Sequence, residues 1–435
     1  MAAGSTPPGR GVERSLRLSA MAGGILLRSA RGRARVLLGA DAELVRAQTT
    51  RANAAAVRGT LGHLKGGAQK AGQLVSTLDS LLPQESWREA MTSLQESATP
   101  VGISAMAPVL AAELGDEWRV TFADFCDEPV ASASLGEVYR ATLPDGHEVA
   151  VKVQYPGVAE AVAADLTGLA WALRLAGLFS PGMAAAPVAA ELRQRITGEL
   201  DYRAEGAAQR AFVAAFDGDL DVVVPAVRYA GERILITDWL AGEPLASFAE
   251  NADQPSRDQI GTRFQRFVLS GPARAGYLHA DPHPGNFRVL ADGRLGVLDF
   301  GAVVPMPGGL PESFGHLISA MRSDDPTVVR RELERAGLVR QDADLDVLAL
   351  MDFLGPFSDP ARHDVFEFSP AWLRGQFARE HDPRNPDYAV ALKLTIPPEQ
   401  LMTHRVWLGV VGMLSRLRAR IEVRSELQRW LPGIS

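Results

Sequence analysis

The sequence predicts an α+β protein with two lobes, in which a helical extension comes first and the second lobe is largely helical. Two runs of alternating apolar residues, EVYRATL and HEVAVKVQ, are typical of strands. Short apolar runs around a glycine turn follow at residues 222–245. The chain beyond them has mostly helical spacing, interrupted by one loop-and-hairpin stretch. This order predicts a small β-rich lobe and a larger helical lobe.

Four segments follow from changes in composition along the chain. Residues 1–40 form a basic, partly disordered segment, and residues 41–125 have helical spacing with a stop at Pro83. The β-rich lobe is predicted over 126–240, with a PDG turn between its first two strands and a helical stretch from Ala159 to about Phe216. The helical lobe is predicted over 241–435, and no internal repeat is visible.

Composition excludes several classes of protein. The 435 residues are 22% charged, with a formal net charge of −7, so a general nucleic-acid binder is not expected. The single cysteine, Cys126, excludes an internal disulfide framework, and we interpret it as a small buried residue. No apolar run is long enough to span a bilayer, and no signal peptide is evident. A cytoplasmic protein, peripheral to a membrane at most, is therefore expected.

The segment from Val12 to Gly39 interleaves arginine with leucine and other apolar residues. Such a basic amphipathic helix is able to lie on an anionic membrane surface. The alternative is a solvated helix packed on the protein by its leucine face. We favour the packed helix slightly, because Gly23 and Gly24 would weaken an isolated helix.

The stretch HADPHPGN, residues 279–286, carries the strongest functional signal. Asp281 follows a histidine by two residues, and Asn286 stands five residues further on. After a DG turn and an apolar run, Asp299 opens the sequence DFG. This joint spacing matches the catalytic loop and metal ligands of protein kinases, with Asp281 as catalytic aspartate and Asn286 and Asp299 as metal ligands.

Oxygen ligands of this kind suit Mg²⁺ or Mn²⁺ bound to the phosphates of ATP. The alternative is an ordinary surface loop rich in turn-forming residues, which a lone DFG would favour. A zinc site is disfavoured, because only His279 and His283 lie close together and no cysteine accompanies them.

A lysine and a phosphate-covering loop are expected to precede this motif. Lys152 lies in VAVKV, where kinases place the lysine that binds the α- and β-phosphates. The alternative is an ordinary exposed strand residue, and the choice depends on which face of the strand is buried. Upstream, ASASLGEVYRA has a single glycine, Gly136, in place of a glycine-rich loop. Glu205, in ELDYRAE, is a candidate partner for Lys152 and is four residues from Asp201, on the same face of an expected helix. Taken alone, that acidic cluster would be read as ordinary solvated helix charge.

Six motifs in a fixed order add a resemblance to a family. They are KAGQ (Lys70 to Gln73), ASASLGEVYRA, VAVKVQYPG, ELDYRAE, HADPHPGN and DFG. Together they resemble the UbiB/AarF family of atypical kinases, related to the mitochondrial kinase-like proteins of coenzyme Q biosynthesis. The resemblance runs from about Leu61 to at least Val304 and more loosely to the end.

The resemblance implies a protein-kinase-like fold that binds ATP with Mg²⁺ or Mn²⁺. It places Lys70 and Gln73 in an extension that covers the active site, beside an acidic motif of Glu199 and Asp201. It implies an ion pair between Lys152 and Glu205. The catalytic set is Asp281, Lys152, Lys70 and Gln73. The nucleotide-binding set is Ala131, Ser132, Ala133, Ser134, Gly136, Lys152, Glu205 and Asp238.

Two departures from the family pattern are visible. Glu137 stands where the family commonly has glutamine, and its charge would weaken nucleotide binding if it pointed toward the phosphates. The chain ends at SELQRWLPGIS without the hydrophobic anchor helices of many members. Peripheral membrane association, through the basic first segment, is the remaining expectation.

Three functions remain open on the sequence. The first is an ATPase or kinase that supports isoprenoid-quinone or lipid metabolism together with proteins of that pathway. The second is a nucleotide-gated scaffold at a membrane surface. The third is a small-molecule phosphotransferase, which the KAGQ motif and the alanine-rich loop disfavour. The aromatic run near Phe366 is read as core packing in preference to a lipid-contact surface.

Overall fold

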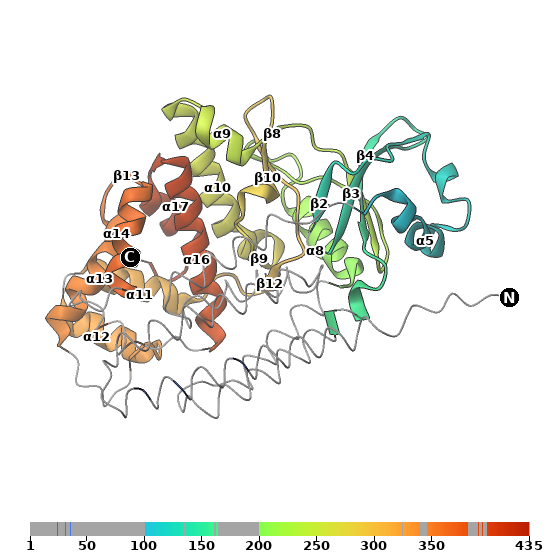
Figure 1. The fold of residues 1–435 in the computed structure, drawn as a ribbon. Coiled ribbons are helices and arrows are strands. Elements are labelled where there is room, and N and C mark those ends of the chain that lie inside the picture. Colours follow the sequence, from blue (N-terminus) through green and yellow to red (C-terminus); the bar gives the residue numbers. More distant parts are fainter. Residues whose placement is uncertain are drawn as a thin grey trace. The chain divides into compact units, whose positions relative to one another are not determined.

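The computed structural model describes residues 101–133, 135–160, 162–163, 200–323, 325–339, 346–381, 390, 394 and 398–434, together with 24, 31 and 35. The basic first segment and most of the predicted helical extension lie outside these described residues. The chain divides into two compact units (Figure 1). The first contains residues up to 203 and 229–236, and the second contains 204–228 and 237–435.

The first unit is built on a six-stranded sheet. Its strands are β1 (Asp124–Phe125), β2 (Ala131–Ala133), β3 (Gly136–Thr142), β4 (Glu148–Gln154), β6 (Val227–Ala230) and β7 (Ile234–Asp238), of which the first two residues of β6 and the last two of β7 belong to the second unit. They lie in the order β1-β3-β4-β7-β6, and β2 pairs with β3. The predicted hairpin is confirmed, with Gly136 opposite Gln154 and Thr142 opposite Glu148. Gly146 supplies the positive φ of 86° that its turn requires.

One face of this sheet packs against the helix α5 (Ile103–Leu114) and the short helix η1 (Trp118–Thr121). Val149, Val151 and Val153 are fully buried, as the alternation of β4 predicts, and they join Met106 and Leu110 of α5 in one core. The helical prediction for 41–125 is wrong at its end, because Asp124–Phe125 extends the sheet beside β3.

The second unit is mostly helical. Its helices are α8 (Tyr202–Ala215), whose first two residues belong to the first unit, α9 (Leu245–Asn251), α10 (Gln254–Ala275), η2 (Pro284–Asn286), α11 (Glu312–Arg322), α12 (Pro326–Arg335), α13 (Val347–Arg362), α14 (Pro370–His381), α16 (Pro398–Leu417) and α17 (Val423–Trp430). Its strands are β5 (Val222–Val223), β8 (Glu243–Pro244), β9 (Tyr277–His279), β10 (Phe287–Val289), β11 (Leu295–Val297), β12 (Val303–Pro305), β13 (Phe366–Glu367) and β14 (Arg420–Ile421).

Helix α10 is the centre of the second unit. Its buried residues Phe264, Phe267 and Val268 belong to a core that also contains residues of β9, β10, β11, α16 and α17. Figure 1 shows α16 and α17 alongside α10. Asp253 caps α10 by accepting the Ser256 N–H, and Gly276 ends the helix in the left-handed conformation. The chain then enters β9, which leads directly into HADPHPGN.

Two small strand groups hold that motif. Strands β10 and β11 form the hairpin predicted around Asp292-Gly293, within a sheet ordered β5-β11-β10-β8. Strand β9 pairs with β12, so His279 lies opposite Val303. The residues just before Asp281 and just after DFG are therefore neighbours in one ladder.

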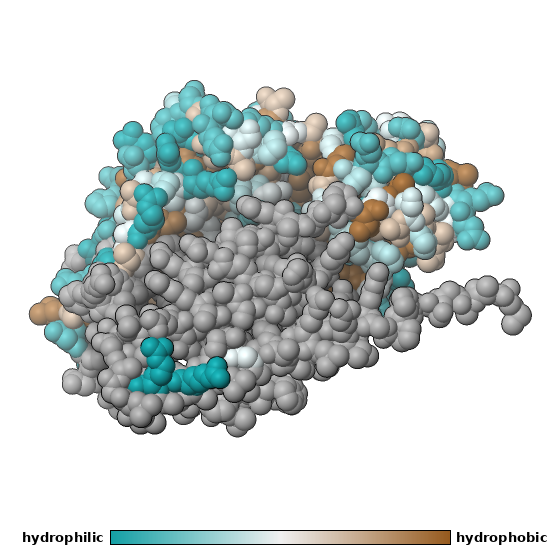
Figure 2. All heavy atoms as spheres, in the orientation of Figure 1, coloured by the Kyte–Doolittle hydropathy of each residue, from teal (hydrophilic) through white to brown (hydrophobic). Residues whose placement is uncertain are grey.

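The described surface is mixed. On the face drawn in Figure 2, hydrophobic residues appear singly or in small groups among hydrophilic ones. Within the described residues, no helix is long and apolar enough to cross a membrane. Cys126 is exposed, so its prediction as a buried residue is wrong; its thiol donates to the Glu128 carbonyl. The prediction of core packing is confirmed for Phe366 and Phe368, which are buried.

Candidate active site

The HADPHPGN loop is braced by its own asparagine. The Nδ2 of Asn286 donates to the Oδ2 of Asp281 at 2.9 Å and to the Asp281 carbonyl oxygen at 3.1 Å. The Asp281 carbonyl also accepts the His283 N–H at 2.7 Å, and the His283 carbonyl accepts the Asn286 N–H at 3.0 Å. The structure therefore brings Asp281 and Asn286 together. Because the amide nitrogen is used on Asp281, the amide oxygen of Asn286 is the atom offered to a cation.

Asp299 is brought to the same region by the hairpin. The Leu298 N–H donates to the Asn286 carbonyl at 2.9 Å, so the strand that carries Asp299 runs beside Asn286. The Oδ1 of Asp299 accepts the Gly301 N–H at 2.9 Å, which fixes the carboxylate at the start of DFG. The two predicted metal-binding residues, Asn286 and Asp299, thus lie close to each other at the open end of one hairpin.

The buried side chain of His279 contacts the backbone of Asp299. His279 is 1% exposed, and its Nε2 lies 2.8 Å from the Asp299 carbonyl oxygen. A carbonyl only accepts, so Nε2 carries the proton in this contact. The rings of Phe267, Phe287 and Phe300 surround the imidazole. Burial lowers the pKa of His279 below its ordinary value, which keeps the ring neutral.

This positioning role was not predicted from the sequence, in which His279 was interpreted as the histidine of the H-x-D signature and was disfavoured as a zinc ligand. The signal available was the short run YLHA, whose residues Leu278, His279 and Ala280 are all buried in and directly after β9. His283 is exposed, and its Nδ1 accepts the Gly285 N–H. Within the described part of the chain, no group of three His, Cys, Asp or Glu residues is placed to hold a metal ion.

The donor set nevertheless suits Mg²⁺ or Mn²⁺ bound together with a nucleotide. Mg²⁺ in phosphoryl-transfer enzymes typically takes one or two protein oxygens and completes its shell with phosphate oxygens and water. The carboxylate of Asp299 and the amide oxygen of Asn286 are such hard ligands. An all-protein cage of three carboxylates is not required for this kind of site.

Glu205 adds a second carboxylate beside DFG. A Cβ placed on Gly301 would lie 3.2 Å from the Oε2 of Glu205 and 3.3 Å from the Oδ1 of Asp299. Both carboxylates therefore flank Gly301, and Glu205 is buried. Like charges at such close range disfavour each other unless cations compensate them. This is the environment expected around a lysine and a metal ion.

The first unit holds the predicted phosphate-covering loop and the predicted lysine. Lys152 lies between buried valines, so its side chain leaves the sheet on the face opposite the core, and its Nζ lies 5.0 Å from the centre of the Tyr202 ring. Gly136 opens β3, where any Cβ would overlap the Val153 carbonyl oxygen. Ala131–Ala133 form β2, paired with β3. Lys152 and Glu205 belong to different units, so their ion pair stays a prediction.

Glu137 is turned into the first unit. It is fully buried, and its carboxylate accepts the Val101 N–H at 2.6 Å and the Tyr139 hydroxyl at 2.5 Å. Burial, together with this hydrogen bond, raises the pKa of Tyr139. The charge of Glu137 is thus held by two donors of its own unit.

The acidic motif is only partly described. Asp201 comes before α8 and accepts the N–H and the Nε of Arg203, so the prediction that it shares a helix face with Glu205 is wrong. The hydrogen bond from Arg203 lowers the pKa of Asp201. Asp238 pairs with Arg228 at 2.5 Å, and its assignment to the nucleotide site stays a prediction. The other predicted residues, Lys70, Gln73, Ser134 and Glu199, lie outside the described residues.

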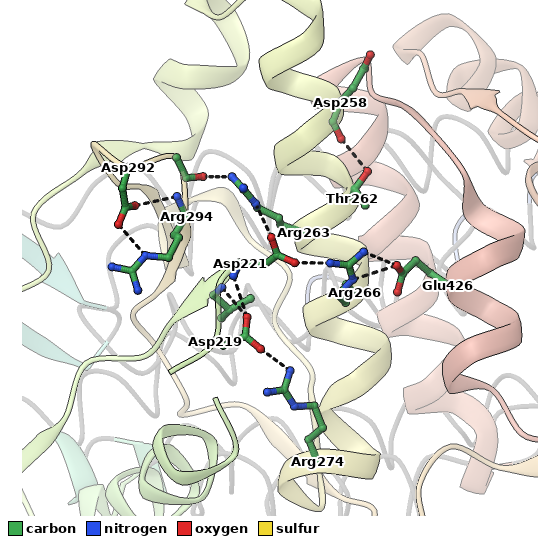
Figure 3. Close-up of polar contacts among 12 residues, drawn as sticks. Asp219, Asp221, Asp258, Thr262, Arg263, Arg266, Arg274, Asp292, Arg294 and Glu426 are labelled. Atoms are coloured by element: carbon green, nitrogen blue, oxygen red, sulfur yellow. Dashed lines mark hydrogen bonds and ion pairs between the residues drawn. The ribbon is translucent and has the colours of Figure 1, made fainter. Parts of the chain in front are cut away.

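An ion-pair network contacts the turn of the β10–β11 hairpin (Figure 3). Arg263 of α10 donates to the Gly293 carbonyl in the hairpin turn and to the Oδ1 of Asp221. The Asp221 carbonyl accepts the Leu295 N–H of β11 at 2.8 Å. Arg266 joins Asp221 to Glu426 of α17. Sequence reasoning missed this network, because its members are far apart in the chain.

Comparison with known proteins agrees with this geometry. The model of the ABC1 atypical kinase-like domain matches residues 93–332, more than half of the chain. The chain belongs to the ABC1 atypical kinase-like family. The predicted α+β kinase-like fold and the resemblance to this family are thereby confirmed.

Several relatives are similar over most of this chain. The mitochondrial atypical kinase coq-8 of Caenorhabditis elegans is 29% identical over 85% of this chain, which spans half of that protein's length. The mitochondrial atypical kinase COQ8 of Saccharomyces cerevisiae is 28% identical over 82% of this chain and 72% of its own. The solved structure of the Rv3197–erythromycin complex from Mycobacterium tuberculosis is 35% identical, with a TM-score of 0.69, over 90% of this chain and 99% of that one.

Proposed function

We propose that this protein binds ATP with Mg²⁺ or Mn²⁺ and transfers the terminal phosphoryl group to water or to a small acceptor. The observation that carries the proposal is the hydrogen bond from Asn286 Nδ2 to the Asp281 carboxylate at 2.9 Å, beside Asp299. It orients a general base and the amide oxygen of a metal ligand at once. A buried neutral histidine holds the third residue of the set.

Each residue has a defined task in this reaction. Asn286 and Asp299 would hold the divalent cation, which neutralises charge on the transferring phosphoryl group. Asp281 accepts the proton of the attacking hydroxyl as the new P–O bond forms and ADP leaves. Lys152 contacts the α- and β-phosphates, and Glu205 restrains that lysine. Gly136 and the alanine-rich strand before it bring backbone N–H groups close to the phosphates.

The pathway we propose is isoprenoid-quinone or lipid metabolism, at an anionic membrane surface and together with other proteins of that pathway. The support is the similarity to mitochondrial atypical kinases named COQ8. The alternative of a nucleotide-gated scaffold uses the same binding site without turnover. The two differ in whether phosphate is released.

The test is metal-dependent phosphate release by the purified protein, with and without anionic liposomes. Asp299→Asn should lower release at least about 100-fold, because it removes a charged metal ligand at the transferring group. Asparagine keeps the oxygen that accepts the Gly301 N–H, so the fold should persist. Asp292→Asn is the matched control, because it makes the same charge change in the exposed turn of the same hairpin.

Unchanged release by a folded Asp299→Asn variant would refute the assignment. Release that rises with liposomes and disappears in the variant supports a membrane-responsive ATPase. Tight, metal-dependent nucleotide binding without release in any condition supports the scaffold.

A second candidate function is binding of a macrolide. It rests on the relative whose structure contains erythromycin and which this chain matches over 90% of its length. Calorimetric titration with erythromycin, with and without ATP and Mg²⁺, tests it. Absence of heat at the highest soluble concentration would remove this candidate.

A further inference from the structure

Helix α16 approaches the HADPHPGN loop at a single glycine. A Cβ on Gly409 would overlap the Cγ of Pro282 and would lie 3.3 Å from its Cδ and 3.6 Å from its Cβ. Pro282 directly follows Asp281 in the chain. At this point of contact, only hydrogen fits between the helix and the residue next to the catalytic aspartate.

The proline ring cannot turn away as a flexible side chain would. Its atoms are closed onto the backbone nitrogen, so moving Cγ out of contact means moving the loop backbone. Carbon atoms pack at about 3.5–4.0 Å, so relief of the overlap needs a shift of about 1 Å or more. The hydrogen bonds of Asp281 with His283 and Asn286 make the loop move as a unit.

The helix is less able to give way than the loop. On either side of Gly409, Val406 and Val410 are buried, and one turn further on Leu414 is almost fully buried in the core of the second unit. Interiors of this density transmit strain and do not absorb it. The loop, whose residues His283 and Gly285 are exposed, is the part expected to shift.

We propose that Gly409 is a positioning residue. Because it has no side chain, the loop can approach α16 closely, and this close approach sets the position of Asp281. This inference rests on the proposed function and adds to it a determinant on α16, outside the sequence motifs of the site. Gly409 touches no substrate and acts through Pro282 alone.

The experiment compares Gly409→Ala with Gly412→Ala. Both change a glycine to alanine within α16, but a Cβ at Gly412 would meet no described atom within 4 Å apart from its chain neighbours and the backbone of its own helical turns. Because a misplacement of about 1 Å can cost about 100-fold in rate, Gly409→Ala should lower kcat for ATP turnover on that scale. KM for ATP should change far less, since Asp281 acts on the attacking group. Gly412→Ala should match the wild-type protein.

A rescue variant separates positioning from general damage. Adding Pro282→Ala to Gly409→Ala removes the ring carbons that collide. The kcat of this double variant should be at least tenfold higher than that of Gly409→Ala. Pro282→Ala alone provides the baseline. Wild-type kcat in Gly409→Ala, or a loss that Pro282→Ala fails to restore, would overturn the proposal.

Hydrogen exchange gives a readout that needs no turnover. Amide exchange of a peptide covering residues 280–287 should be faster in Gly409→Ala than in Gly412→Ala, because the His283 and Asn286 N–H groups lose their alignment. If the wild-type protein releases no phosphate in any condition, the proposed function has failed and exchange decides this inference. Equal exchange in the two variants would then overturn it.

Discussion

Arg266 connects two parts of the second unit, and replacing it with leucine should destabilise the protein measurably. Its guanidinium donates to the Oε1 of Glu426 from Nε at 2.9 Å and from Nη2 at 2.6 Å, and it also pairs with Asp221 (Figure 3). The hydrogen bond to Glu426 is the main cause of the raised pKa of Arg266. The side chain of Glu426 is 6% exposed, whereas that of Arg266 is 29% exposed.

The magnitude follows from what each partner keeps. Without Arg266, Asp221 still pairs with Arg263 at 3.0 Å, but among the described residues Glu426 keeps only the Trp430 Nε1 donor at 3.1 Å. Removing one partner of a fully buried pair costs about 3–5 kcal/mol. Since Arg266 is partly exposed and Glu426 retains one donor, we expect Arg266→Leu to lower the free energy of unfolding by about 2–3 kcal/mol.

The assay is urea unfolding followed by tryptophan fluorescence, with Trp430 as a local reporter. A double-mutant cycle with Glu426→Leu isolates the pair, and the double variant should recover most of the loss because no buried charge remains. Arg294→Leu is the control, since that arginine pairs with Asp292 in an exposed turn and should cost less than about 0.5 kcal/mol. A loss below about 1 kcal/mol in Arg266→Leu, or no recovery in the double variant, would refute the reasoning.

Three further outcomes are expected. Gly136→Ala should unfold the first unit or break the pairing of β3 with β4, because the new methyl group overlaps the Val153 carbonyl. Limited proteolysis would reveal this unfolding as faster cleavage, and cleavage as slow as in the wild-type protein would contradict the prediction. Burial lowers the pKa values of His279 and His404 below 6.5, so the unfolded chain binds more protons than the folded one at acidic pH. The free energy of unfolding should therefore fall as pH drops below about 6.5, by up to about 1.4 kcal/mol per pH unit for each histidine. Unfolding midpoints at pH 7 and pH 5.5 measure this loss, and equal midpoints would exclude it. Gly412→Ala should raise stability by about 0.5–1 kcal/mol, as alanine does inside helices, unless calorimetry finds a lower midpoint.

Local pattern was sufficient to predict two of the hairpins among the described residues. Alternating valines and a PDG turn predict β3 and β4, and the Asp292-Gly293 turn predicts β10 and β11. Side-chain alternation has a period of two in any strand, so burial of one set of residues follows without knowledge of the partner. The joint spacing of Asp281, Asn286 and Asp299 predicts their grouping because one hairpin connects them.

Contacts between distant segments had no such signal. Arg266 and Glu426 are 160 residues apart, and Gly409 meets Pro282 across more than a hundred residues. Residue type also failed to predict burial for Cys126, which is exposed, because a two-residue strand at the sheet's edge leaves little to cover it. The predicted helix included Asp201, but α8 begins at Tyr202. The Asp201 side chain accepts the Arg203 N–H, which a carbonyl of a preceding helical turn would otherwise accept.

The loop and the DFG segment are ordered by contacts that do not involve a nucleotide. Asn286 braces Asp281 from within the loop, His279 fixes the Asp299 carbonyl from the core, and α16 limits the loop from below at Gly409. Fixed dipoles and charges accelerate a reaction because they need no reorganisation when charge develops. Packing around the imidazole therefore holds the Asp299 backbone, and packing along α16 limits the loop at Pro282. Substitutions in those layers should consequently change turnover before they change nucleotide affinity.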